Sequence, residues 1–314
     1  MNAYIVGVDV GGTKTSVVLG SLRGEIRRRT HFPTEPTRGF RPVFEDIVSH
    51  IKDARRVADA DVLAVSVSIG GPLNVKEGII KDPPHLPGWH NIHLKTMLAT
   101  ESGLPVYVEH DGNAGALAEL YFGAGKGLKN IIFLTMGTGF GAGLILNGRL
   151  YRGSTDVAGE IGHIRIAEDG PECYGKRGSL EGYASGTGIA LLAREMAPEK
   201  YGSGVTPAEL YRDFQAGVPE SRRVFERAAL YLGRGFAMLA DMLNPELIIL
   251  GGIGMRIRDA LVEPAMSVFH AEALPESRRA CSIVPAGLGE SIGDFASLCA
   301  ALDQGGLSEV AKAQ

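Results

Sequence analysis

Residues 9–19 read DVGGTKTSVVL, and residues 135–146 read TMGTGFGAGLIL. Each stretch follows a run of apolar, largely β-branched residues, at 4–10 and at 131–135, and leads into a second apolar run. Each pattern therefore predicts a strand, a glycine-rich turn and a second strand. This similarity favours a duplicated fold. The alternative is that two glycine-rich hairpins arose independently.

The rest of the chain alternates predicted strands with predicted helices, as is typical of α/β proteins. Further strands are predicted at residues 25–32, 62–69, 105–109, 142–146 and 246–250. Helices are predicted at residues 40–57, 113–122, 221–243 and 291–302. We expect two α/β domains, residues 1–122 and 123–290. We expect the C-terminal helix, residues 291–303, to pack back on the first domain, and the tail at 304–314 to fray.

Composition excludes several classes of protein. The 314 residues carry a net charge of −4, which lacks the basic excess of most nucleic-acid binders. Cys173, Cys281 and Cys299 are odd in number and widely spaced, so a reducing cytosol fits better than a disulfide framework. No basic region precedes the first apolar run, and the longest uncharged apolar stretch, residues 131–146, is short for a bilayer. We expect a cytoplasmic protein with no membrane or nucleic-acid partner.

The first glycine loop has the residues of an anion site. Gly11 and Gly12 allow a tight turn in which backbone N–H groups converge, and Thr13 and Lys14 add a hydroxyl and a positive charge. Asp9, at the strand end, is predicted to hold Mg²⁺ through water, because Mg²⁺ keeps several waters in proteins. A plain hairpin turn explains the glycines but not the flanking Asp, Thr and Lys.

The second loop, residues 135–139, lacks the Lys-Ser/Thr pair of a P-loop, so alone it is a weak signal. Together with the first loop, it predicts a nucleotide held between two domains.

Two further segments carry polar side chains suited to catalysis and sugar binding. Asp111 lies between a predicted strand and a predicted helix, where it is either an N-cap or the group that accepts a hydroxyl proton during phosphoryl transfer. Glu160, His163 and Glu181 lie in a glycine-rich stretch and are good partners for vicinal sugar hydroxyls. The alternative for these three is a solvated loop.

Five segments, in order and over essentially the whole chain, resemble the ROK family of sugar kinases and related repressors. They are DVGGTK (9–14), VEHDGNAGALAELYFGAGKGL (108–128), MGTGFGAG (136–143), EIGHIRIAEDGPECYGKRGSLEGYASG (160–186) and LNPELIILGG (243–252). Residues 108–186 especially resemble the N-acetylmannosamine kinase domain. The resemblance implies a two-domain actin-like ATPase (ribonuclease H-like) fold, α/β and duplicated, with a cleft between its domains. It also implies a homodimer and ATP-dependent, Mg²⁺-assisted phosphorylation of a hexose, commonly at O6.

The resemblance also assigns roles to residues, with Asp111 as the general base. The implied sugar contacts are Gly71, Asn74, His85, His110, Asp111, Glu160, His163 and Glu181. The implied ATP contacts are Asp9, Gly11, Gly12, Thr13, Lys14, Thr138, Gly139, Gly251 and Gly252. Repressors of the family carry an additional N-terminal helix-turn-helix. Because the first loop begins at residue 9, we expect none here.

The chain departs from the family's zinc motif, which uses one His and three Cys. His163 and Cys173 remain, whereas Tyr174 stands near the second Cys position and Ser179 at the third. Two ligands do not close a structural zinc site. We therefore predict no structural zinc, and we expect the ring and hydroxyl of Tyr174 to help order the loop instead.

Two imidazoles replace asparagines that face the sugar in family members. His85 and His110 occupy these positions and change the pattern of donors and acceptors. An amino sugar, a modified hexose or a cyclitol is therefore an alternative to glucose as the substrate. Two further hypotheses are a sugar-sensing regulatory protein without kinase activity and a sugar kinase that uses polyphosphate.

Overall fold

The computed structural model describes residues 3–309, and the chain divides into two compact units. Unit 1 comprises Met1–Lys126, Gly153–Asp156 and Glu290–Gln314, and unit 2 comprises Gly127–Arg152 and Val157–Gly289. No helix within residues 3–309 combines the length and the apolar character needed to cross a bilayer.

The tail expected to fray, residues 304–314, lies partly outside the described residues, which end at 309. Within them, Gln304 is the last residue of a helix, and its side-chain amide donates a hydrogen bond to the Val108 carbonyl at 2.9 Å. The start of the expected tail is therefore held by a specific contact.

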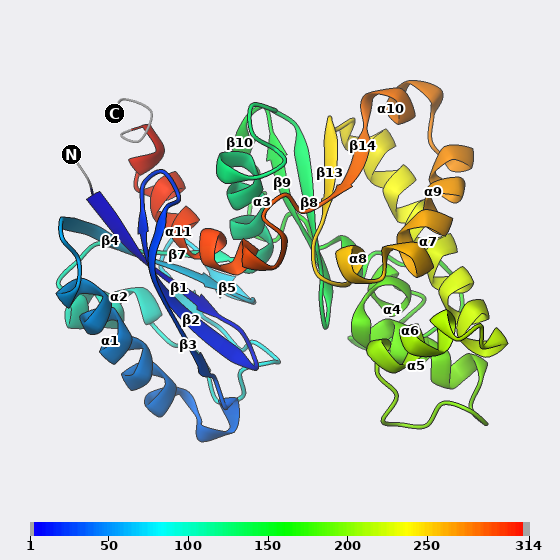
Figure 1. The fold of residues 1–314 in the computed structure, drawn as a ribbon, viewed down its shortest axis with the longest axis horizontal. Helices are drawn as coiled ribbons and strands as arrows, with labels where there is room; N and C mark the ends of the chain where they lie inside the picture. The colour runs from blue at the N-terminus through cyan, green and yellow to red at the C-terminus, as the bar shows by residue number, and fades with distance from the viewer. Residues whose placement is uncertain (1–2, 310–314) are drawn as a thin grey trace. The chain divides into compact units, whose positions relative to one another are not determined.

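Unit 1 is built on a five-stranded sheet in the order β3-β2-β1-β4-β7 (Figure 1). The first three strands are antiparallel neighbours, whereas β1, β4 and β7 run parallel. A two-stranded sheet pairs β5 with β6. The strands are β1 (Ala3–Val10), β2 (Lys14–Ser21), β3 (Ile26–Pro33), β4 (Asp61–Ile69), β5 (Leu73–Asn74), β6 (Ile79–Ile80) and β7 (Val106–His110).

Helices cover both faces of this sheet because its strands are apolar on both sides. Tyr4, Val6 and Val8 of β1 belong to a core shared with α1 and α2. Gly7, which points the other way, lies so close to Ser297 of α11 that a Cβ would come within 2.2 Å of its hydroxyl. The helices of unit 1 are η1 (Pro36–Arg38), α1 (Phe40–Arg56), α2 (Leu94–Ser102), α3 (Asp111–Phe122) and α11 (Ile292–Gln304).

Unit 2 repeats this arrangement with the strand order β10-β9-β8-β13-β14 (Figure 1). Again an antiparallel meander joins two parallel strands. The predicted duplication is therefore confirmed at the level of sheet topology. The strands are β8 (Ile131–Met136), β9 (Phe140–Leu146), β10 (Arg149–Leu150), β13 (Leu247–Leu250) and β14 (Ser282–Pro285), with a separate hairpin of β11 (Glu172–Cys173) and β12 (Lys176–Arg177).

The longest helix of unit 2, α7, is buried around most of its circumference, and its apolar residues share one core with this sheet and with neighbouring helices. It begins at Pro219, two residues before the predicted start, because proline is well tolerated in the first turn of a helix. The helices of unit 2 are η2 (Ile161–His163), α4 (Leu180–Ala184), α5 (Gly186–Met196), α6 (Pro207–Gln215), α7 (Pro219–Leu243), α8 (Ile253–Arg256), α9 (Arg258–Glu272) and α10 (Pro275–Ala280). The short η3 (Gly289–Ser291) precedes α11.

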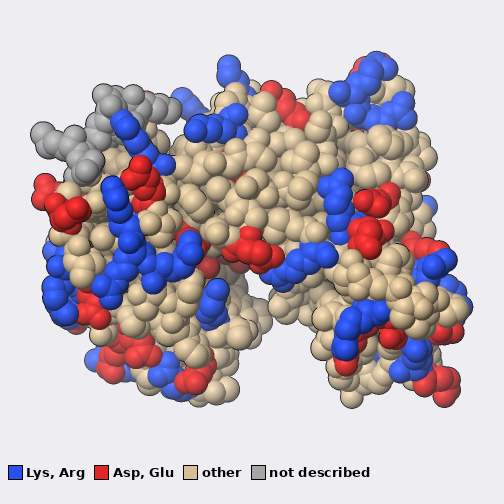
Figure 2. Space-filling view, viewed as in Figure 1, with Lys and Arg blue, Asp and Glu red and all other residues tan. Residues whose placement is uncertain are grey.

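Charged side chains of both signs are interspersed over the face shown in Figure 2. This distribution agrees with the small net charge of −4. The face in view therefore lacks the continuous basic surface that a polyanion would select.

Candidate functional site

The first predicted phosphate loop lies where β1 turns into β2. Thr13 and Lys14 are exposed, and the Gly11 N–H donates to the Lys14 carbonyl at 3.1 Å, which closes the turn. A Cβ on Gly12 would lie 3.1 Å from the Cβ of His85, so glycine here allows two segments to approach closely. The loop thus offers an exposed hydroxyl and an exposed ammonium group.

Asp9, near the end of β1, lies in a negatively charged environment. Burial is the main reason that the pKa of its carboxyl rises to about 7. A hydrogen bond with Ser68 opposes this shift, and the carboxylates of Asp111 and Asp294 add to it. A Cβ on Gly293 would lie 2.7 Å from Asp9 Oδ2, so glycine lets the start of α11 approach the carboxylate. This concentration of negative charge fits a cation held through water.

Asp111 lies at the junction of β7 and α3, but it is not the N-cap. The N-cap is His110, and Asp111 is the first helical residue. Asp111 Oδ1 accepts a hydrogen bond from the Gly112 N–H at 2.7 Å and lies 3.2 Å from His110 Nδ1. Its side chain remains 47% exposed, so the carboxylate is accessible to a ligand. A negatively charged side chain in the first turn of a helix interacts favourably with the helix dipole.

Two imidazoles lie beside two consecutive glycines that follow β4. A Cβ on Gly70 would come within 2.4 Å of the His85 ring, and one on Gly71 within 2.9 Å of the His110 ring. Burial lowers the pKa of His85, while the charge of Asp111 opposes that shift. The predicted residues of unit 1 thus gather at the carboxyl ends of β1, β4 and β7, where open α/β sheets bind ligands.

Sequence reasoning missed Glu109, which lies fully buried two residues before Asp111. Its Oε1 accepts hydrogen bonds from the His110 N–H and from Asn113 Nδ2, both at 3.0 Å. Its Oε2 accepts one from Gln304 Nε2 at 3.2 Å. Glu109 therefore ties β7 and α3 to α11. A carboxylate at the end of an apolar strand was the available signal.

Two of the predicted residues, Asn74 and Gly252, have local structural roles. Asn74 Oδ1 accepts a hydrogen bond from the Glu77 N–H at 3.0 Å, which stabilises a turn. Gly251 and Gly252 follow β13, and Gly252 has φ +56°. A Cβ on Gly252 would lie 2.0 Å from the Met136 carbonyl, so packing against the end of β8 requires glycine there.

The second predicted phosphate loop joins β8 to β9 in unit 2. The Gly137 N–H donates to the Gly139 carbonyl at 3.0 Å. The start of α5 holds this loop, because Gly186 N–H donates to Gly137 O at 2.8 Å and Thr187 N–H to Thr138 O at 3.2 Å. Thr138 is exposed. The loop is thus anchored through its carbonyls.

Glu160, His163 and Glu181 come together beside the second loop. His163 Nε2 lies 3.6 Å from Glu160 Oε2, and both side chains are about half exposed. Glu181 Oε2 accepts a hydrogen bond from the Phe140 N–H at 2.9 Å. Burial raises the pKa of Glu181, and the hydrogen bond from Phe140 opposes this rise. The cluster of Glu160, His163 and Glu181, called here the acidic cluster, presents several hydrogen-bonding groups to a polyhydroxylated ligand.

The segment that corresponds to the family's zinc motif forms the β11–β12 hairpin. Burial raises the pKa of the Cys173 thiol to about 11, which disfavours the thiolate that zinc requires. Within residues 3–309, no three or more His, Cys, Asp or Glu side chains form a group that could hold a metal ion. Instead, the Tyr174 ring lies 5.0 Å from the His163 ring, and Lys176 Nζ donates to the His163 carbonyl at 2.6 Å. The absence of structural zinc stays a prediction.

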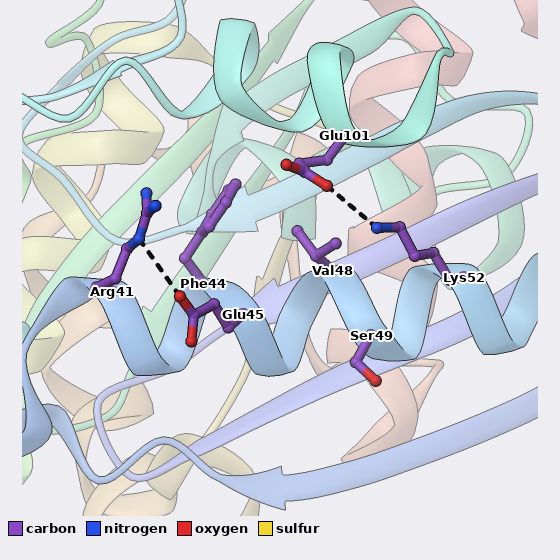
Figure 3. Close-up of a pocket in the computed structure, with 7 residues that line it drawn as sticks. All are labelled: Arg41, Phe44, Glu45, Val48, Ser49, Lys52 and Glu101. Carbon is purple, nitrogen blue, oxygen red and sulfur yellow. Dashed lines mark hydrogen bonds and ion pairs between the residues drawn. The ribbon is translucent and has the colours of Figure 1, made fainter.

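A hollow of about 380 Å³ lies beside α1 and α2. Figure 3 shows the side chains that line it. One ion pair, between Lys52 and Glu101, joins α1 to α2 beside the hollow, and another, between Arg41 and Glu45, lies along α1. None of the predicted site residues lines the hollow. Its lining residues are Arg41, Phe44, Glu45, Val48, Ser49, Lys52 and Glu101.

The sequence pattern of the ROK family matches residues 5–301. The chain belongs to the ROK family. A glucokinase from Halalkalibacterium halodurans is 34% identical over 306 residues, which cover 92% of this chain and 92% of that protein. A ROK hexokinase from Thermus thermophilus has a TM-score of 0.83 at 32% identity, covering 96% of this chain and 99% of that one.

A ROK glucokinase from Streptomyces griseus, solved with glucose and AMPPNP, has a TM-score of 0.78 at 30% identity, covering 96% of this chain and 99% of that one. The two structural matches confirm the expected two-domain α/β sugar-kinase fold.

Proposed function

We propose that this chain transfers the γ-phosphate of ATP to O6 of a hexose or hexose-like sugar, with Asp111 as the general base. The chain is an ATP-dependent sugar kinase, as its glucokinase relatives of 34% and 30% identity indicate. The position of transfer and the roles of individual residues belong to the proposal.

The observation that carries the proposal is the geometry around Asp111. Its carboxylate is accessible, lies at a helix N-terminus and has the His110 imidazole 3.2 Å away. In the proposed reaction, it accepts the proton of the sugar hydroxyl as that oxygen bonds to the γ-phosphorus. The bond from phosphorus to the bridging oxygen breaks, and ADP leaves with its electron pair. Positioning matters more than basicity in this step.

The first glycine loop is the proposed phosphate-binding element of unit 1. Thr13 and Lys14 present a hydroxyl donor and a positive charge, both exposed. Asp9 is the proposed partner of a hydrated Mg²⁺, because a buried carboxylate near two others favours a nearby cation. When bound, Mg²⁺ neutralises charge on the transferring phosphates. Thr138 and Gly139 of unit 2 are assigned to the phosphates by the same proposal.

The acidic cluster is the proposed sugar-binding element of unit 2. The Glu160 carboxylate accepts hydrogen bonds from hydroxyls, and the His163 imidazole donates or accepts according to its tautomer. Glu181, which already accepts from Phe140, retains a second carboxylate oxygen for a ligand. In unit 1, His85 and His110 are proposed to select among sugars, since a site that bonds particular hydroxyls rejects analogues that leave polar groups unpaired.

The test is ADP release over a panel of hexoses, amino sugars and cyclitols, with wild type and Asp111→Asn. We expect the variant to keep the wild-type fold and to lose about 10²- to 10⁴-fold in kcat, the usual contribution of a general base. Retention of more than about a tenth of wild-type kcat would exclude Asp111 from the chemical step. Sugar binding by wild type without ADP release would instead indicate a regulatory sugar-binding protein.

A further inference from the structure

Two hairpins of unit 2 share one kind of turn but differ in the residue at its first position. Asn147 and Gly148 join β9 to β10, with φ +54° and +76°. Tyr174 and Gly175 join β11 to β12, with φ +50° and +69°. Two positive φ angles match the turn for which Asn-Gly is preferred. Tyrosine is rarely found in this left-handed conformation.

The Tyr174 side chain makes a contact that accounts for its placement in the turn. Its ring centroid lies 5.0 Å from that of His163, with 56° between the planes. The same hairpin binds the His163 backbone, because Lys176 Nζ donates to the His163 carbonyl at 2.6 Å. The β11–β12 hairpin therefore contacts both the ring and the main chain of His163. An unfavourable backbone conformation kept in such a place is a pointer to function.

The charges of the acidic cluster act on the phenol of Tyr174. Burial raises its pKa first, and the charges of Glu181 and Glu160 raise it further. The hydroxyl therefore stays protonated near neutral pH and remains a hydrogen-bond donor. The Tyr174 residue is nevertheless 64% exposed, so burial in the core does not explain why it occupies this turn.

We propose that Tyr174 is a positioning residue for sugar binding: its ring fixes the orientation of the His163 imidazole relative to Glu160. The inference rests on the proposed function, in which His163 and Glu160 contact the sugar. An imidazole without this contact would rotate about its side-chain bonds and would lose conformational freedom on binding the sugar. Sugar affinity, rather than turnover or ATP affinity, is the quantity that this residue controls.

The decisive variant is Tyr174→Gly, because it removes the ring and places in the turn the residue that best accepts its backbone angles. We expect the KM for the sugar to rise about threefold to tenfold, the range of a single aromatic contact. We expect kcat and the KM for ATP to stay within about twofold, and the melting temperature not to fall. Asn147→Gly makes the same backbone change in the other hairpin and should leave every parameter unchanged.

Tyr174→Phe keeps the ring and should restore most of the sugar affinity. An unchanged sugar KM in Tyr174→Gly would overturn the inference. So would a parallel loss of kcat, ATP affinity and melting temperature, which would indicate a purely structural role.

A second measurement separates this inference from the proposed function. Ring ¹⁵N and ¹H resonances of His163, assigned by their absence in His163→Gln, should shift in Tyr174→Gly but not in Asn147→Gly. Unchanged resonances would overturn the inference whether or not the protein phosphorylates a sugar. Shifted resonances in a protein that phosphorylates no sugar would support the contact and refute the proposed function.

Discussion

Replacing Asp9 by asparagine should stabilise unit 1 at pH 8 by clearly more than it does at pH 5. Burial raises the pKa of Asp9 to about 7 from its ordinary value of 3.8, so the folded protein binds a proton that the unfolded chain releases over this pH range. Stability is therefore lost as the pH rises from about 4 to 7. Above pH 7, the folded wild type holds an unfavourable buried charge, which Asp9→Asn removes.

The size of the stabilisation by Asp9→Asn follows from the shift in the pKa of Asp9. A difference of about three pKa units corresponds to at most about 4 kcal/mol. Because Asp9 is largely but not completely buried, and the remaining solvent contact screens part of its charge, we expect about 1–2 kcal/mol of stabilisation at pH 8. The hydrogen bond with Ser68 can persist in the variant, since an asparagine side chain also accepts from a hydroxyl.

The sequence supplies a convenient probe for this measurement. Trp89 is the only tryptophan, lies in unit 1 and is fully buried, so its fluorescence reports the unfolding of the unit that contains Asp9. Urea titrations of wild type and Asp9→Asn at pH 5 and pH 8 give the comparison. Asp53→Asn, on the surface of α1, controls for general charge effects. An equal difference between variant and wild type at the two pH values would refute the reasoning.

Two further predictions concern unit 2. Gly252→Ala should destabilise the protein by about 2–4 kcal/mol, because its Cβ would meet the Met136 carbonyl at a positive φ. Urea unfolding followed by circular dichroism measures this loss of stability. In the control variant Gly148→Ala, the added Cβ meets nothing within 4 Å, so this variant shows the cost of the positive φ without the contact. Equal losses of stability in both variants would contradict the explanation. The purified protein should contain far less than one zinc per chain, and a chelator should leave its melting temperature unchanged. Stoichiometric zinc whose removal lowers that temperature would show that other residues supply ligands.

The local sequence pattern predicted the strands and helices whose apolar residues recur at a regular spacing. The strand expected at residues 4–10 is β1 (Ala3–Val10), and the helix expected at 221–243 is α7 (Pro219–Leu243). The glycine loops were equally visible, because their glycines interrupt apolar runs at both strand ends. These features depend on residues close in sequence, where period and turn chemistry decide the structure.

Helices with weaker signals were missed. The short α2 (Leu94–Ser102) buries only Leu94, Leu98 and Ser102, so its periodicity is brief. The longer α9 (Arg258–Glu272) contains Pro264, which argues against a helix interior when only local pattern is considered. Packing against α7 stabilises α9 in the fold, and such support between segments has no local trace in the sequence.

The candidate site also has features that the local sequence predicts and features that depend on the tertiary structure. Asp9 and Asp111 were recognisable from their neighbours in the chain, and of the two alternatives for Asp111 the N-cap is wrong, because His110 occupies that position. The closeness of Asp294 to Asp9, and of Gln304 to Glu109, depends on how α11 docks on the sheet. Long-range side-chain contacts of this kind require the tertiary structure.

The position of α11 has a consequence for the order in which the two units complete their folding during synthesis. The face of the unit 1 sheet that carries Gly7 and Gly20 packs against Leu298, which the ribosome adds only after all of unit 2. Until then that face lacks its covering helix, and Glu109 lacks Gln304. Most residues of unit 2, by contrast, form two nearly contiguous stretches that are complete by Gly289. The unit that begins first along the chain is therefore the one that finishes folding last.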